Sequence, residues 1–129
     1  MIKDIETRED IDRLMVKFYE RAFADETIGY IFTDVARLDL KHHLPVIGDF
    51  WETLLFGTGS YQRHGRSPLQ IHARLSQKSP LCSEHFKRWR EIFHRTVDEM
   101  FAGARADFAK LRADAIANRM LEYVGGAAA

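Results

Sequence analysis

Six histidines carry most of this chain's capacity for metal or acid–base chemistry, and His72 has the most informative position among them. It follows a loop with glycines at Gly57, Gly59 and Gly65, and it lies between two stretches that are rich in aromatic residues. Those aromatic residues are Phe50, Trp51, Phe86, Trp89 and Phe93. Haem iron is commonly held by one neutral imidazole while the porphyrin is buried between apolar side chains. The pattern therefore favours an iron site of this kind, with His72 as the ligand.

Two other histidines are candidates for the same role. His43 shares a helical face with Ile47 and with the aromatic pair that follows it, and His85 lies four residues before Trp89. His94 has charged neighbours one helical turn away on either side, which indicates a solvated side chain. The spacing alone therefore leaves His43 and His85 as alternatives to His72.

Other chemistries fit the sequence less well. The adjacent His42 and His43 lack the i, i+4 spacing of two zinc ligands on one helical face, and no H-E-x-x-H occurs. The single cysteine cannot build a structural zinc cluster. Cys82 and His85 could meet on a helix, but no third group is in place to orient them as a nucleophile and its base. The glycines also match no phosphate-binding motif.

Composition restricts the function classes. The 129 residues fit a single domain, which we expect to span 1–129 with an ordered core of about 7–124. The 19 basic residues balance the 19 acidic ones, which argues against a nucleic-acid partner or a charge-driven membrane partner. One cysteine, with no signal-peptide pattern and no long apolar run, favours a cytoplasmic protein without a membrane span.

The hydrophobic periodicity predicts helices throughout. The first begins near Thr7, which forms a capping-box pattern with Asp10. Its apolar face comprises Ile11, Leu14, Met15, Phe18, Tyr19, Ala22 and Phe23. A short turn or one-turn helix is expected at 29–32, followed by a connector at 34–39.

A second helix is predicted from about Leu40 to Phe56, where the glycines of the following loop end it. Because an interior proline disrupts a helix, we expect the regular part to begin at 42–44, so that Pro45 falls in its first turn. Pro68 can start a short helix that carries His72. Two long helices follow at about 83–101 and 107–123. The apolar residues of the last helix are Phe108, Leu111, Ala115, Ile116, Met120 and Val124.

Taken together, these residues resemble the bacterial truncated globins, and more narrowly their group III. The matching segments are Phe18-Tyr19-Glu20, Ile31-Phe32, His43 with the run from Ile47 to Trp51, Gly57 to Tyr61, Pro68 to Leu75, and Phe86 to Trp89. Their order and spacing extend over nearly the whole chain. The resemblance implies an all-α fold in which two helix pairs form a two-on-two sandwich around one b-type haem.

The resemblance also implies a role for individual residues. His72 matches the proximal iron ligand, whereas Tyr19, His43 and Trp89 match distal residues that would stabilise a bound ligand. Ile47 would form an apolar distal wall, Phe32 would pack on the porphyrin, and Phe93 would line the pocket. Tyr61 and Arg66, with Arg63, His64 and Arg74, are candidates to bind the haem propionates.

The expected function is the binding of dioxygen and other diatomic ligands at haem b, with redox detoxification of nitric oxide, peroxide or peroxynitrite. A catalytic cycle would need an external reductant, because 129 residues leave no room for a reductase domain. Two alternatives stay open. One is a passive binder or sensor without turnover, and the other is a haem-free helical interaction module.

Overall fold

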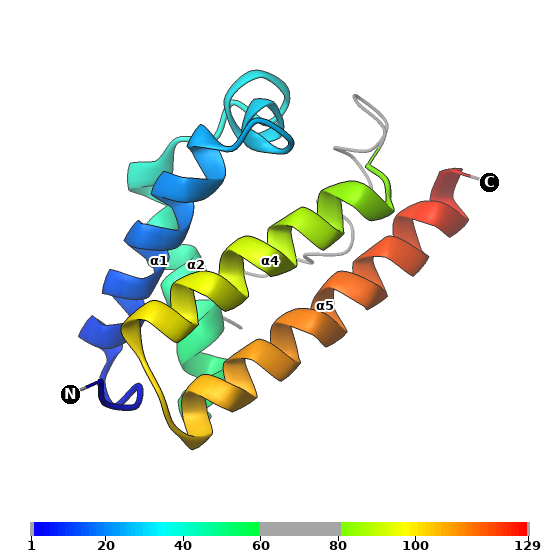
Figure 1. The fold of residues 1–129 in the computed structure, drawn as a ribbon. Helices are drawn as coiled ribbons and strands as arrows, with labels where there is room; N and C mark the ends of the chain where they lie inside the picture. The colour runs from blue at the N-terminus through cyan, green and yellow to red at the C-terminus, as the bar shows by residue number, and fades with distance from the viewer. Residues whose placement is uncertain (1, 60–80, 129) are drawn as a thin grey trace.

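The helices of this protein form two pairs. The computed structural model describes residues 2–59 and 81–128, and these ranges are helical and contain no strand. The elements are α1 (Arg8–Ala24), η1 (Ile31–Val35), α2 (Leu40–Phe56), α4 (Ser83–Met100) and α5 (Ala104–Ala128). Helix α1 packs on α2, α4 packs on α5, and a contact between α1 and α4 joins the two pairs (Figure 1). The all-α, two-on-two arrangement predicted from the sequence is confirmed.

Helix α1 begins as the sequence predicts. The Thr7 hydroxyl accepts a hydrogen bond from the backbone N–H of Asp10, and the Asp10 carboxylate accepts one from the N–H of Thr7. This reciprocal pair satisfies two amide groups that a helix start otherwise leaves free. The buried apolar face comprises Ile11, Leu14, Met15, Phe18, Tyr19 and Ala22. The sequence therefore identified both the start of α1 and the face that turns inward.

The segment after α1 is more regular than the sequence suggested. A π-helix, η1, spans Ile31–Val35, so the predicted connector at 34–39 is wrong for its first two residues. The wider turn is closed by the backbone N–H of Ala36, which donates to the carbonyl of Ile31. Such π-turns are short and often occur at functional sites. Here the turn carries Phe32, one of the predicted site residues.

Helix α2 begins earlier than predicted. Asp39 is its N-cap, with a side chain that accepts from the N–H of Lys41 at 3.2 Å and a carbonyl that accepts from His43 at 2.9 Å. The regular helix therefore starts at Leu40 instead of 42–44, and Pro45 lies inside it. The aspartate cap stabilises the first turn of the helix. This stabilisation offsets the loss of the backbone hydrogen bond that Pro45 cannot donate. Gly57 ends the helix with a left-handed φ of 71°.

Helices α4 and α5 lie side by side (Figure 1). The buried residues of α5 are mostly small: Ala106, Ala109, Ala113, Ala117 and Met120. Three of the apolar residues predicted for this helix do not face inward: Phe108 is 45% exposed, Leu111 is 66% exposed, and Ala115 is exposed as well. The buried residues follow the three- and four-residue spacing of a single helical face, so the larger Phe108 and Leu111 lie on other faces of α5. Helix α5 also starts before 107, because the Asp4 carboxylate accepts from the N–H groups of Arg105 and Ala106.

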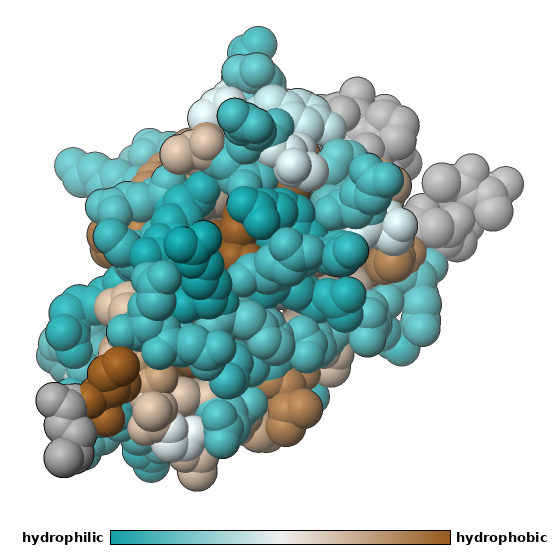
Figure 2. Space-filling view, viewed as in Figure 1, coloured by the Kyte–Doolittle hydropathy of each residue, from teal (hydrophilic) through white to brown (hydrophobic). Residues whose placement is uncertain are grey.

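The side of the molecule seen in Figure 2 is largely hydrophilic, with apolar residues in separate spots. The apolar side chains gather in one main cluster between the helix pairs, centred on α1 and α4. Phe18, Phe93 and Val97 lie at its centre and have at most 2% of their surface exposed. Among the described residues, no helix combines the length and apolar character needed to cross a membrane.

Candidate functional site

A buried tyrosine–histidine pair connects α1 to α2. The Tyr19 hydroxyl and the Nε2 atom of His43 are 2.9 Å apart and share a hydrogen bond. Their rings meet edge to face, with centroids 5.2 Å apart. Only 6% of the Tyr19 surface is exposed, and His43 is half-buried. The sequence left open whether Pro45 would turn His43 away, and the structure shows that His43 points towards Tyr19.

Two phenylalanines flank this pair. Phe32 of η1 meets the Tyr19 ring edge to face at 6.0 Å and stacks on Phe23, with centroids 5.4 Å apart. Phe23 also meets Tyr19 edge to face, at 6.4 Å. The polar atoms of Tyr19 and His43 are thus bordered by apolar rings from α1 and η1. Phe23 was assigned to the apolar face of α1, but sequence reasoning missed its contact with Phe32.

Burial changes the acidity of Tyr19. Removal of the phenol from water raises its pKa well above the ordinary value of 10.0. Tyr19 therefore keeps its proton throughout the physiological pH range and remains a neutral hydroxyl. A neutral hydroxyl offers one donor and two acceptor positions, so it can serve His43 and one further partner.

Trp89 and Phe93 stand on α4 and face α1. Trp89 is half-buried, meets Phe18 edge to face at 5.8 Å, and stacks on Phe93 at 5.7 Å. Phe93 has no exposed surface and stacks on Trp51 of α2 at 4.9 Å. A continuous set of aromatic rings therefore joins α1, α2 and α4. Within it Phe93 occupies a core position, while Trp89 keeps part of its surface open.

The remaining predicted residues divide into two groups. Ile47 is half-buried and packs against the main apolar cluster. His72, Tyr61 and Arg66 lie outside the described residues, as do the other propionate candidates of the same loop. The roles assigned to all of these residues remain predictions.

Two other histidines have partners of their own. The Nδ1 atom of His85 accepts a hydrogen bond from the backbone N–H of Cys82 at 3.0 Å, and Nε2 lies 3.0 Å from the Tyr30 hydroxyl. Both ring nitrogens of His85 are thus engaged, which weakens the case for it as a metal ligand. His94 was predicted to be solvated, but its Nε2 pairs with the Asp114 carboxylate at 2.8 Å, which links α4 to α5.

A carboxylate holds the turn after α1 against α4. The Asp25 side chain, 7% exposed, accepts from Nε of Arg88 at 2.8 Å and from the backbone N–H groups of Thr27 and Ile28. Burial opposes the charge on Asp25, but Arg88 and the two amides outweigh it and lower the pKa of the carboxyl. The contact thus anchors Arg88, which precedes Trp89 on α4.

An arginine joins the beginning of α1 to the middle of α2. Arg8 donates to Asp49 at 2.7 Å and to Glu52 at 3.4 Å, and it also reaches the carbonyl oxygen of Pro45 at 3.2 Å. A fourth contact, to Asp12 at 2.9 Å, lies on its own helix. Burial works against the charge, but the hydrogen bonds with Asp12 and Asp49 raise the Arg8 pKa. Sequence reasoning missed this group; the two acidic residues in the second half of α2, Asp49 and Glu52, were the available signal.

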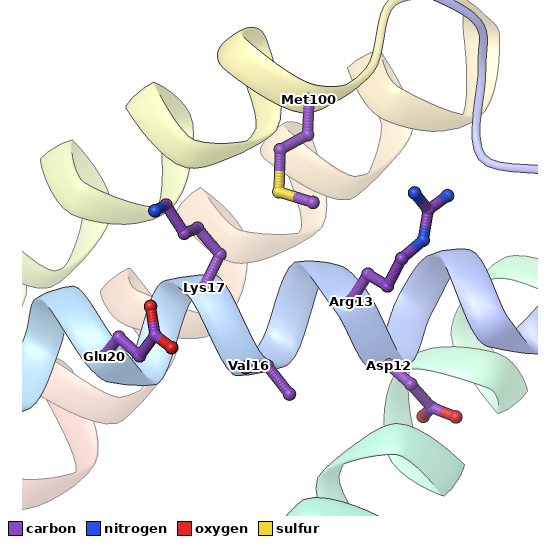
Figure 3. Close-up of a pocket in the computed structure, with 6 residues that line it drawn as sticks. All are labelled: Asp12, Arg13, Val16, Lys17, Glu20 and Met100. Atoms are coloured by element: carbon purple, nitrogen blue, oxygen red, sulfur yellow. The ribbon is translucent and has the colours of Figure 1, made fainter.

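An open groove of about 350 Å³ lies elsewhere, between the outer face of α1 and the end of α4 (Figure 3). Its lining residues are Asp12, Arg13, Val16, Lys17, Glu20 and Met100. None of the predicted site residues is among them. Within the described ranges, no three histidine, cysteine or acidic side chains converge as a metal cluster.

Comparison with known proteins agrees with this architecture. No family model matches the chain. A curated protein, the group 3 truncated haemoglobin of Campylobacter jejuni, is 30% identical over 125 residues, which cover 92% of this chain and 94% of that protein. The crystal structure of a group III truncated haemoglobin from the same organism superposes with a TM-score of 0.81 at 28% identity. That match covers 96% of this chain and 95% of the other.

The fold thus defines an all-α protein of the truncated globin class. At this identity and coverage, the chain belongs to the group 3 truncated haemoglobins.

Proposed function

We propose that this chain is a haem protein that binds dioxygen and other diatomic ligands on the side of Tyr19 and His43. The observation that carries the proposal is the buried hydrogen bond between these two residues, 2.9 Å long and bordered by Phe23 and Phe32. Haem, when bound, supplies an iron that takes up diatomic gases. The family membership supports this assignment.

The described residues fit a haem. A porphyrin needs apolar walls, and the half-buried Phe32, Ile47 and Trp89 all pack against the main apolar cluster. A diatomic ligand that gains partial negative charge needs a hydrogen-bond donor, which the Tyr19 hydroxyl provides when the Nε2–H group of His43 donates to the Tyr19 oxygen. His72 is proposed as the residue that would hold the iron, as the resemblance implies. Tyr61 and Arg66 are proposed to reach the propionates.

The chain's own groups would act together on such a ligand. With Tyr19 uncharged, its hydroxyl and the His43 ring can share their protons with a third polar partner. Apolar rings around them exclude water, which strengthens each hydrogen bond. One such bond contributes about 1 kcal/mol, and more when the partner is charged. The Trp89 indole N–H is proposed as a second donor from α4.

We further propose that the bound ligand enters redox detoxification. For nitric oxide the balanced reaction is NO + O₂ + e⁻ → NO₃⁻, in which the electron comes from an external reductant. The donors on Tyr19 and Trp89 would stabilise the negative charge that develops on oxygen. A passive binder or sensor would use the same residues to hold the ligand, without the reducing step.

Absorption spectra of the haem-loaded protein test the binding proposal. We expect a sharp Soret band in the wild type and in His85→Gly, and a changed ferrous spectrum in His72→Gly. The absence of a Soret band in the wild type would contradict haem binding. A spectrum altered by His85→Gly, but not by His72→Gly, would contradict the assigned ligand.

Nitrate production tests the turnover proposal. Nitric oxide and dioxygen are supplied together with a chemical reductant, and the number of nitrate ions formed per protein molecule is measured. Many nitrates per protein are expected from the wild type and fewer from Tyr19→Phe. One nitrate per protein, with the reductant present in excess, would favour the passive binder.

A further inference from the structure

The half of α2 that carries His43 is less firmly built than the rest of the helix. Pro45 has no N–H, so the carbonyl of Lys41 lacks the partner that a regular helix would supply. The first turn, which contains His43, is therefore joined to the rest of α2 by one hydrogen bond fewer. The contacts of α2 with α1 therefore help to hold this first turn in its orientation.

Helix α2 has two polar attachments to α1, one on each side of Pro45. The first is the hydrogen bond between Tyr19 and His43. The second is the Arg8 clamp, which we define as the contacts of Arg8 with Asp49, Glu52 and the carbonyl oxygen of Pro45. Two polar attachments at separate points, added to the apolar packing between the helices, restrain the rotation of α2 against α1 more than one attachment would.

Gly48 makes room for the clamp. A Cβ atom at this buried position would lie 2.6 Å from Nη2 of Arg8 and 2.9 Å from the Asp12 carboxylate. These distances are too short for any real contact, so the guanidinium group occupies the space that a larger residue would need. Arg8 and Gly48 therefore act as one unit, although they stand on different helices.

We propose that Arg8 is a positioning residue for the Tyr19–His43 pair. By binding α2 just beyond Pro45, the Arg8 clamp sets the rotation of the helix, and this rotation places Nε2 of His43 against the Tyr19 hydroxyl. Arg8 touches neither ring, so it acts through the backbone of α2. The effect on a bound diatomic ligand rests on the function proposed above, whereas the effect on His43 itself does not.

Two variants remove the clamp in opposite ways. Arg8→Met keeps a flexible, unbranched stem but removes the guanidinium donors, and it is expected to lower the thermal stability. Gly48→Ala displaces the guanidinium group and at the same time introduces a better helix former. If positioning is the role, both variants will disturb His43, although their effects on stability differ.

Arg21→Met is the matched control. Arg21 also stands on α1, but it binds Thr96 and Glu99 of α4 and so holds the other helix pair. Its loss removes a comparable ion pair without touching α2. A general loosening of α1 would appear in this variant as well.

Nitrogen-15 NMR of the histidine rings in the haem-free protein gives the first readout. We expect the Nε2 signal of His43 to move in Arg8→Met and in Gly48→Ala, and to stay in place in Arg21→Met. The dioxygen dissociation rate of the haem-loaded protein is the second readout. We expect it to rise about three- to tenfold in both clamp variants, with no further increase in the double variant.

A His43 signal that keeps its wild-type position in both clamp variants would overturn the proposal and leave Arg8 a merely stabilising residue. An equal shift in Arg21→Met would overturn it too. If the His43 signal moves, but neither the clamp variants nor Tyr19→Phe change dioxygen dissociation, the positioning role stands. In that case, the result contradicts only the proposal that the diatomic ligand binds beside Tyr19 and His43.

Discussion

Within the described ranges, two tyrosine–histidine hydrogen bonds of nearly equal length lie in very different surroundings. Tyr19 and His43 are 2.9 Å apart, and Tyr30 and His85 are 3.0 Å apart. Both pairs meet edge to face. Tyr19 is 6% exposed among aromatic rings, whereas Tyr30 is 38% exposed at the surface. The two pairs combine the same residue types, and they differ most in the burial of the tyrosine.

This difference shows why a residue pair alone does not define a site. Water competes for the donors and acceptors of the Tyr30–His85 pair, so their net contribution is small. Around Tyr19 and His43, the low local dielectric strengthens the hydrogen bond and raises the cost of an unsatisfied donor. The buried pair can therefore hold a polar ligand, while the exposed pair links two surface segments.

The largest expected difference between the pairs is in ligand release. Tyr19→Phe removes one donor to a partly charged ligand, worth about 1.5–3 kcal/mol, so dioxygen should dissociate about 10- to 100-fold faster. Tyr30→Phe should leave the rate within about twofold of the wild type, because exposed contacts contribute little. Stopped-flow dissociation measures both variants. Equal rates in the two would remove the distinction.

The next effect concerns stability near the exposed pair. Asp25→Ala removes the contact with Arg88 and two capped amides, so the free energy of unfolding should fall by about 1–2 kcal/mol. Tyr30→Phe, which also affects a contact between the segment after α1 and α4, should change the free energy of unfolding by less than about 0.5 kcal/mol. Urea denaturation gives both values. A larger loss for Tyr30→Phe would mean that the Tyr30–His85 pair, instead of Asp25, holds the segment after α1 against α4.

The pH dependence of the Asp25 contribution has a definite sign. Because the folded protein lowers the pKa of this carboxyl, the contribution is complete above the unfolded value of about 4. It is then lost as the pH falls through the lowered folded-state pKa. The stability difference between the wild type and Asp25→Ala should therefore shrink below about pH 4. A constant difference across this range would contradict the ion pair.

A smaller effect is expected when the histidines are removed. His43→Ala should release dioxygen about fivefold faster, as expected for the loss of about 1 kcal/mol. It should also speed ligand binding if His43 acts as a gate, whereas His85→Ala should alter neither rate. Flash photolysis of the carbon monoxide complex measures binding. An unchanged binding rate in His43→Ala would exclude the gate.

The smallest expected effect appears in an alkaline titration, which compares variants of the two tyrosines. Burial raises the Tyr19 pKa, so the protein should lose stability above about pH 10, where the unfolded chain ionises first. Absorbance near the phenolate band during an alkaline titration should contain a late phase. This phase should vanish in Tyr19→Phe and persist in Tyr30→Phe. Its persistence in Tyr19→Phe would assign it to another residue.

Much of the fold could be predicted from periodicity and caps. The start of α1 at Thr7 and the end of α2 at Phe56 followed from local patterns, which depend on neighbours in the sequence. The outward position of Phe108 was not predicted, because the buried face of α5 consists mostly of alanines and leaves out the largest apolar residues of the helix. The early start of α5 depends on Asp4, a residue about 100 positions away.

The candidate site could be predicted only in part. The resemblance singled out Tyr19 and His43, but their contact depends on the crossing of α1 and α2, which no local pattern encodes. The Arg8 clamp was missed for the same reason, since its partners lie about 40 residues away. For His85, the Tyr30 contact likewise depends on tertiary packing.

The carbon–oxygen stretching frequency of the carbon monoxide complex tests most directly which pair faces the bound ligand. A hydrogen-bond donor beside the ligand oxygen lowers this frequency, so its removal raises it. We predict a shift to higher wavenumber in Tyr19→Phe and a wild-type value in Tyr30→Phe. A wild-type value in Tyr19→Phe would contradict the claim that the buried pair forms the ligand side of the haem site.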